Sequence, residues 1–253
     1  GYTRSMDDMT IQNPPYVVIT SHHRNQKIGR AFSDGCGGMM VSVENFLSSP
    51  NKTSVATYGI LRGSGECIKN AENFWYIDHG YFKRSTCLNR CEGYFRVVKN
   101  ALWHDGSGDH TWDRFNTLKI TLQGWRKNGD HVVVVPPSNY MTFFLGLENW
   151  LDDVLVRIKQ YTDRPIVISD KQNCPISEAL KNAWVVVTDH SNAAIDAMIE
   201  GVPAIMTNPS RVNGSIQEIE SPPMSRDMFR NLANCQWTLE EMRSGQAWES
   251  FKW

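Results

Sequence analysis

Polar residues able to bind a phosphate lie between two apolar segments in the second half of the chain. Residues 184–187, a tryptophan followed by three β-branched valines, form an apolar run typical of a parallel strand buried on both faces. Residues 188–192 then supply hydroxyl, carboxylate, imidazole and amide groups that can cap a helix beginning near Ala193. The free N–H groups and positive dipole end of that helix would attract an anion. The sequence therefore predicts a strand, a phosphate-binding turn and a helix.

The predicted helix carries a carboxylate one turn after its start. Asp196 follows Ser191 and Asn192 at a spacing that would let it bind ribose hydroxyls while the helix start holds a phosphate. Gly201 to Pro203 end the helix before another strand at 204–206. Two interpretations remain open from these residues alone, a nucleotide-binding βαβ unit and an ordinary capped crossover without a ligand.

Residues 191–197 and 201–203 resemble the donor-binding segment of glycosyltransferases of the GT-B fold. Over roughly 131–209 the chain looks like the C-terminal domains of bacterial capsule-type transferases and of similar phage-encoded enzymes. Residues 75–81 and 234–239 also look like recurring segments of phage proteins. The resemblance implies a nucleotide-sugar donor, UDP-linked, with no obligatory catalytic metal. It also implies C-terminal helices that return to the first domain.

Two further residues follow predicted strands and would face the donor phosphates. Ser138 comes after the strand 131–136, and Lys171 comes after the strand 165–169, although an ordinary loop lysine is an alternative for Lys171. Such an enzyme needs groups that stabilise the departing diphosphate, and we expect Ser191, Asn192, Ser138 and Lys171 to hold it. The expected donor site comprises Ser138, Lys171, His190, Ser191, Asn192 and Asp196.

A carboxylate and an imidazole close a predicted strand in the first half of the chain. The strand 74–78 runs into Asp78, His79 and Gly80, and catalytic groups of α/β folds favour the carboxyl end of a strand. Glycosyl transfer needs a base that removes a proton from the acceptor hydroxyl. We expect Asp78 to be that base, with His79 as its partner and Asp34 as the second candidate.

Asp34 belongs to a polar segment with several glycines, residues 21–38, directly after a predicted strand at 16–20. We interpret this segment as a loop that binds the acceptor or a phosphate, with a mobile surface loop as the alternative. Its glycine spacing fits neither the Rossmann fingerprint nor the P-loop, which disfavours a dinucleotide or ATP site.

The charge of the chain is unevenly distributed. Residues 1–127 contain 16 Lys and Arg against 11 Asp and Glu, and the remainder contains 10 against 16. Residues 81–100 interleave cations with aromatic residues, a combination that can hold phosphates and stack on a base. With the phage-like segments, this favours double-stranded DNA as acceptor, at a hydroxymethylated pyrimidine flipped from the stack. A surface-polysaccharide transferase and a sugar- or nucleotide-binding protein without turnover remain alternatives.

Length and composition indicate a globular α/β protein. The 253 residues are 41% hydrophobic, enough for two Rossmann-like domains facing a cleft, which we place at 1–127 for the acceptor and 128–253 for the donor. No stretch is long and apolar enough for a membrane span, and residues 1–8 lack the apolar core of a signal peptide, so we expect a cytoplasmic enzyme. Among six scattered cysteines only Cys87 and Cys91 are close, so we expect reduced thiols and no metal site. Further helices are predicted at 140–161, 177–182, 227–233 and 238–244.

Overall fold

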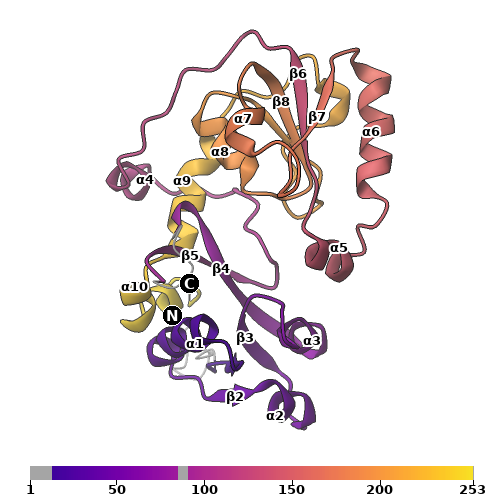
Figure 1. Cartoon of the computed structure of the whole chain (residues 1–253). Coiled ribbons are helices and arrows are strands. Elements are labelled where there is room, and N and C mark those ends of the chain that lie inside the picture. The colour runs from indigo at the N-terminus through magenta and orange to yellow at the C-terminus, as the bar shows by residue number, and fades with distance from the viewer. Residues whose placement is uncertain (1–12, 85–90, 253) are drawn as a thin grey trace, which may run out of the picture. The chain divides into compact units, whose positions relative to one another are not determined.

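The computed structural model describes residues 13–84 and 91–252, which form two compact α/β units (Figure 1). Unit 1 comprises the described parts of Gly1–Leu102 and Cys235–Trp253, and unit 2 is Trp103–Asn234. Each unit has its own sheet, so the prediction of a two-part α/β protein is confirmed. The expected cleft between the two parts stays a prediction.

Unit 1 is built on a six-stranded sheet with the order β10-β5-β4-β3-β1-β2. The strands β2, β1, β3 and β4 are parallel, whereas β5 is antiparallel to β4 and β10 is antiparallel to β5. The elements of unit 1 are β1 (Tyr16–Ile19), α1 (His23–Cys36), β2 (Met40–Ser42), α2 (Val43–Ser48), β3 (Ser54–Tyr58), α3 (Ser64–Asn70), β4 (Asn73–Arg84), β5 (Gly93–Lys99), β10 (Gln236–Trp237), α10 (Leu239–Arg243) and α11 (Gln246–Glu249).

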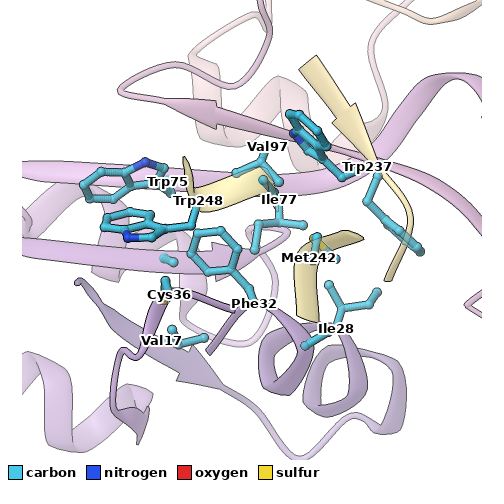
Figure 2. Packing of buried hydrophobic residues seen from close by; sticks show 14 of the residues in the cluster. Val17, Ile28, Phe32, Cys36, Trp75, Ile77, Val97, Trp237, Met242 and Trp248 are labelled. Carbon is cyan, nitrogen blue, oxygen red and sulfur yellow. The ribbon is translucent and has the colours of Figure 1, made fainter. Parts of the chain in front are cut away.

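The core of unit 1 joins its N-terminal strands to the C-terminal helices. The ring of Trp248, on α11, packs against Phe32 of α1 and Trp75 of β4, with centroid distances of 6.3 and 5.2 Å. Met242 of α10 belongs to the same buried cluster (Figure 2). The C-terminal helices therefore pack on the first sheet, which is the arrangement that the resemblance implied.

The segment expected as a glycine-rich loop, residues 21–38, is mostly the helix α1. Ile28 and Phe32 lie one turn apart and are fully buried, so an apolar stripe was present among the polar residues. Gly29 lets the helix approach the sheet, since a Cβ there would lie 2.9 Å from a methyl carbon of Ile19. The interpretation as a loop was wrong because it gave more weight to glycine and polarity than to this periodicity.

The strand expected to end at Asp78 continues to Arg84 and forms a hairpin with β5. Tyr58, the last residue of β3, pairs with Ile77, so Asp78 lies just beyond the carboxyl end of its parallel neighbour. The aromatic-rich segment 81–100 is therefore largely strand. Arg90, one of its cations, lies outside the described residues.

Gln236 fills an irregularity in this hairpin. The pairing of β4 with β5 shifts between His79 and Arg84, which leaves backbone groups of β4 without their regular partners. The fully buried side chain of Gln236 replaces them, since its Oε1 accepts hydrogen bonds from the N–H groups of Tyr81 and Phe82 at 2.8 and 2.9 Å. Its Nε2 donates to the carbonyl oxygen of Phe82 at 3.1 Å.

We expect Gln236→Leu to destabilise unit 1 by about 2 to 4 kcal/mol, because two buried N–H donors would lose their acceptor. Urea unfolding followed by tryptophan fluorescence measures the change. The same substitution at the exposed Gln246, on α11, is the control and should change stability by less than about 0.5 kcal/mol. Equal effects at the two positions would contradict the role assigned to Gln236.

Unit 2 contains a four-stranded, entirely parallel sheet with the order β7-β6-β8-β9. The valine runs of β6 and β8 are buried, as expected for central parallel strands. The elements of unit 2 are α4 (Asp113–Thr117), β6 (His131–Val135), α5 (Asn139–Leu145), α6 (Trp150–Tyr161), β7 (Ile166–Ile168), α7 (Ile176–Ala179), β8 (Ala183–Thr188), α8 (Ala193–Ile199), β9 (Ala204–Met206), the 3-10 helices η2 (Ile216–Glu218) and η3 (Ala233–Cys235), and α9 (Asp227–Leu232).

The single helix expected over 140–161 is two helices. Gly146 ends α5 with a left-handed backbone, φ 68°, and its N–H donates to the carbonyl oxygen of Thr142. The second helix, α6, then buries Trp150, Val154 and Ile158 against the sheet. The apolar recurrence was real, but the glycine stop within it was overlooked.

The structure divides the chain after Leu102 rather than after Lys127. Residues 103–127 are attached to unit 2, where Trp103 stacks on His190 with a centroid distance of 4.1 Å. Farther along, the N–H of Gln123 donates to the carbonyl oxygen of Ile199. The assignment of the two parts to acceptor and donor stays a prediction.

Both sheets share one topological feature. In each parallel part the chain starts in an inner strand, adds the second strand on one side, and adds the third and fourth on the other. The direction therefore reverses between β1 and β3 in unit 1 and between β6 and β8 in unit 2. Open α/β sheets bind ligands beyond the carboxyl ends of the strands at such a reversal.

No helix in the described ranges is long and apolar enough to cross a membrane.

Candidate functional site

A pocket of about 900 Å³ lies at the carboxyl ends of β6, β7 and β8 in unit 2. This is the reversal point of the parallel sheet, and the volume is in the range of small-molecule sites. Its polar lining residues include Ser138, Asn139, Thr142, Glu148, Ser169, Asp170, Lys171, Gln172 and Ser191, beside the apolar Pro136, Pro137, Leu147 and Leu151 and the ring of Tyr140.

Two serines from separate loops face this pocket. Ser138 caps α5 by accepting a hydrogen bond from the N–H of Met141, and Ser191 accepts one from the N–H of Ala193. Thr188 joins the two loops, since its hydroxyl donates to the carbonyl oxygen of Val135 and accepts from the N–H of Ser191. The serine hydroxyls are therefore held near one another by the ends of adjacent strands.

A cation and a carboxylate follow β7 in the same pocket. Lys171 is exposed and directly follows Asp170. The N–H groups of Asn173 and Gln172 donate to Asp170, and these bonds hold the pKa of that carboxyl below its usual value. Ser138, Lys171 and Ser191, all predicted from the sequence as phosphate ligands, thus line one pocket.

The other three predicted donor residues do not line it. His190 is buried, with its Nδ1 2.7 Å from Asp189 Oδ2 and its ring on Trp103. Asn192 lies on the same loop and its amide oxygen faces Arg211 at 3.5 Å. Asp196 lines a different pocket of about 520 Å³ together with charged residues that include Arg126 and Lys181.

Asp189 organises the loop behind the pocket, a role that the sequence pattern did not indicate. Its buried carboxylate accepts hydrogen bonds from Asn208 Nδ2 at 3.0 Å and Thr207 Oγ1 at 3.3 Å, besides its contact with His190. Burial acts to raise the pKa of Asp189, but the bonds from His190 and Asn208 outweigh it, so the pKa lies below its ordinary value. The carboxylate therefore ties the loops after β8 and β9 together.

We expect Asp189→Asn to lower the free energy of unfolding by about 3 kcal/mol at pH 7, because the anionic acceptor of this network is lost. A carboxyl with a lowered pKa in the folded state contributes stability above its unfolded pKa, about 3.9, which is lost as the pH falls through the folded value. Measured from pH 7 to pH 3, the midpoint temperature of thermal unfolding should therefore depend less on pH in the variant than in wild type. Asp152→Asn, at an exposed site on α6, is the control, and its midpoint temperature should change with pH as that of wild type does.

In unit 1, Asp78 lies among groups that fix its orientation. The hydroxyl of Tyr76 donates to its Oδ2 at 2.6 Å, and the N–H of His79 donates to its Oδ1 at 2.8 Å. The buried Arg96 approaches Oδ2 at 3.9 Å and donates to the carbonyl oxygen of His79 at 2.6 Å. The Asp78 side chain is 23% exposed, so a hydroxyl from solution can reach the carboxylate.

His79 is held next to Asp78 as a neutral imidazole. Burial lowers the pKa of His79 and, with the nearby Arg24 and Arg96, overcomes the opposite effect of Asp78. The rings of His79, Tyr58 and Phe95 pack against one another, and His79 Nε2 lies 3.4 Å from the guanidinium of Arg24. Arg24 follows β1 and Tyr58 ends β3, so the group borders the reversal between these two strands. The sequence did not indicate that Arg24, Tyr58 and Arg96 lie near Asp78 and His79, because the packing of α1 and the register of the sheet bring them there.

The structure does not bring Asp34 into this group. Asp34 is exposed in the last turn of α1, which runs back from the carboxyl end of β1. The backbone of Gly38, a few residues later, lies against the carbonyl oxygen of Pro15, just before β1 begins. Asp34 therefore lies toward the amino ends of the strands, at the opposite edge of the sheet from Asp78.

No group of three or more His, Cys, Asp and Glu side chains that could hold a metal ion occurs in residues 13–84 and 91–252. Of the one close cysteine pair, Cys91 is buried with a free thiol and Cys87 lies outside the described residues.

The solved structures similar to this chain include the KpsC β-Kdo 2,4 transferase and the KpsC β-Kdo 2,7 transferase of Thermosulfurimonas dismutans. Both have a TM-score of 0.52, with sequence identities of 10% and 11%. The alignments cover 88% and 93% of this chain and 90% and 99% of those chains. No protein-family model matches the sequence, and neither does any curated protein. The likeness shows that this chain has the fold of these glycosyltransferases.

Proposed function

We propose that this protein is a glycosyltransferase that moves a sugar from a nucleotide sugar to a hydroxyl group of a carbohydrate. The observation that carries the proposal is the likeness of fold, over nearly the whole chain, to two transferases. The pocket at the reversal point of the parallel sheet in unit 2 supports it, since a nucleotide ligand is expected at that position.

The lining of the pocket suits the leaving group of such a reaction. The hydroxyls of Ser138 and Ser191 can donate hydrogen bonds to phosphate oxygens, and Lys171 supplies a positive charge. Donors placed where negative charge develops on the departing phosphate lower the barrier to transfer. A UDP-linked donor remains part of the proposal, to be tested against the other nucleotides.

Asp78 is the proposed base. Its carboxylate takes the proton of the acceptor hydroxyl while the hydroxyl oxygen bonds to the anomeric carbon of the sugar. The bond from that carbon to the nucleotide phosphate breaks, and the phosphate leaves with the electron pair. Tyr76 and the N–H of His79 hold the carboxylate in one orientation. His79, half-buried beside Asp78, is a neutral imidazole and so adds no positive charge next to the carboxylate.

A carbohydrate acceptor is favoured over DNA. The names of the two similar transferases specify 2,4 and 2,7 linkages, which join one sugar to another. The aromatic residues expected to stack on a base are largely core, since Tyr81, Phe82 and Phe95 are at most 1% exposed. Arg96 is buried against Asp78 and His79. Unit 1 as the structure defines it has 14 Lys and Arg against 11 Asp and Glu, a smaller excess than residues 1–127 have.

The test is incubation with UDP-, GDP-, dTDP- and CMP-linked sugars, including nucleotide-activated Kdo, and two kinds of acceptor. One kind is a set of synthetic oligosaccharides, and the other is DNA containing hydroxymethylcytosine or hydroxymethyluracil. Mass spectrometry should show the mass of one sugar added to an oligosaccharide. Addition to DNA alone would restore the DNA interpretation. Nucleotide binding without transfer to any acceptor would favour a binding protein.

Substitution of each candidate base by asparagine distinguishes their roles. We expect Asp78→Asn to lower kcat about 10²- to 10⁴-fold, because an amide cannot accept the acceptor proton, with donor affinity unchanged. Asp34→Asn, the same change at the opposite edge of the sheet, should keep kcat within about twofold of wild type. Steady-state kinetics and donor binding by calorimetry measure both. If Asp34→Asn lost turnover and Asp78→Asn kept it, Asp34 would be the base instead of Asp78.

A further inference from the structure

We infer that Asp170 binds the ribose hydroxyls of the donor nucleotide and so selects ribonucleotides. This assignment rests on the proposed function and names a specificity residue for the same pocket. From the sequence we assigned the ribose to Asp196, but Asp196 does not line the pocket that contains the predicted phosphate ligands. Of the pocket's lining residues, Asp170 and Glu148 carry carboxylates.

The strand order places Asp170 on the ribose side of a bound nucleotide. Ser191 follows β8 and Ser138 follows β6, whereas Asp170 follows β7, on the other side of β6. The turn that holds Asp170 therefore lies beside the loop that holds Ser138, on the side away from Ser191. A nucleotide with its phosphates above β6 and β8 would therefore extend its ribose above β7, with Lys171, next to Asp170, directing its long flexible side chain to the phosphates. In dinucleotide-binding folds, too, a carboxylate beyond the phosphate turn binds the ribose.

The surroundings of Asp170 leave one of its oxygens suited to a ligand. Its Oδ1 accepts hydrogen bonds from the N–H groups of Gln172 and Asn173, which fix the side chain in a turn. Its Oδ2 accepts a hydrogen bond from Asn173 Nδ2 at 3.0 Å, the one hydrogen bond that this oxygen makes within the described part of the chain. A carboxylate oxygen has room for a further donor, and an ionised carboxylate only accepts, which matches the hydroxyls of a ribose.

The pKa of Asp170 is consistent with that role, because the turn holds the carboxyl ionised. Glu148 is the other carboxylate of the pocket, but it is exposed at the end of the α5–α6 connection rather than following a strand. The competing interpretation is that Asp170 only closes the turn 170–173. The two interpretations differ in whether the ribose hydroxyls of the nucleotide contribute to its binding affinity.

Calorimetric titration with UDP, CDP, GDP and ADP, and with their 2′,3′-dideoxy forms, separates the two. We expect wild type to bind the ribose form of its preferred nucleotide about tenfold more tightly than the dideoxy form, as for hydrogen bonds to a charged acceptor. In Asp170→Asn the ratio should fall to about twofold or less. Asparagine can still accept the turn's hydrogen bonds, so the variant should bind the dideoxy form as wild type does, which verifies that the pocket is intact.

Glu148→Gln and Asp196→Asn are the matched controls and should keep the tenfold ratio. Loss of the ratio in either control but not in Asp170→Asn would overturn the assignment, and so would an unchanged ratio in Asp170→Asn. Equal binding of the ribose and dideoxy forms by wild type would overturn it as well. Failure of every nucleotide to bind wild type would overturn the proposed function, and this assignment with it.

Discussion

The buried carboxylate of Asp189 is the interaction on which the architecture of unit 2 depends. It accepts hydrogen bonds from Thr207 and Asn208 after β9, and it holds His190, whose ring stacks on Trp103. A buried anion requires partners, so the loops that supply them are fixed relative to the strand end. At the same strand end, the hydroxyl of Thr188 accepts a hydrogen bond from the N–H of Ser191 and so positions that residue. The pocket is therefore shaped by a polar network behind it.

Unit 1 uses the same topological principle with a different set of side chains. The reversal between β1 and β3 places Arg24 and Tyr58 beside His79, while the antiparallel strand β5 brings the buried Arg96 to Asp78. A guanidinium at this depth needs partners: the carbonyl oxygens of His79 and Leu102 accept its hydrogen bonds, and the Asp78 carboxylate forms an ion pair with it at 3.9 Å. The partly exposed carboxylate is thereby held in a largely buried setting, which suits a group that exchanges a proton with a substrate.

Several elements could be predicted because their signal is local. The valine runs of β6 and β8 identified central parallel strands, and Gly201 to Pro203 marked the end of α8. The helix α1 and the break at Gly146 were also encoded locally, in the Ile28 and Phe32 stripe and in a single glycine, but were given too little weight. The division after Leu102 could not be predicted, because it depends on the stacking of Trp103 on a residue far along the chain.

The sequence by itself determined the two α/β halves and the placement of Ser138, Lys171 and Ser191 after strands, since a polar residue after a buried strand emerges at the sheet edge. Only the tertiary structure decided which of these residues share a pocket. The position of Asp196 on α8 separated it from them, strand order added Asp170, and helix direction separated Asp34 from Asp78. The reason is physical: strand order and helix packing are set by contacts between residues distant in the chain, and no local pattern records them.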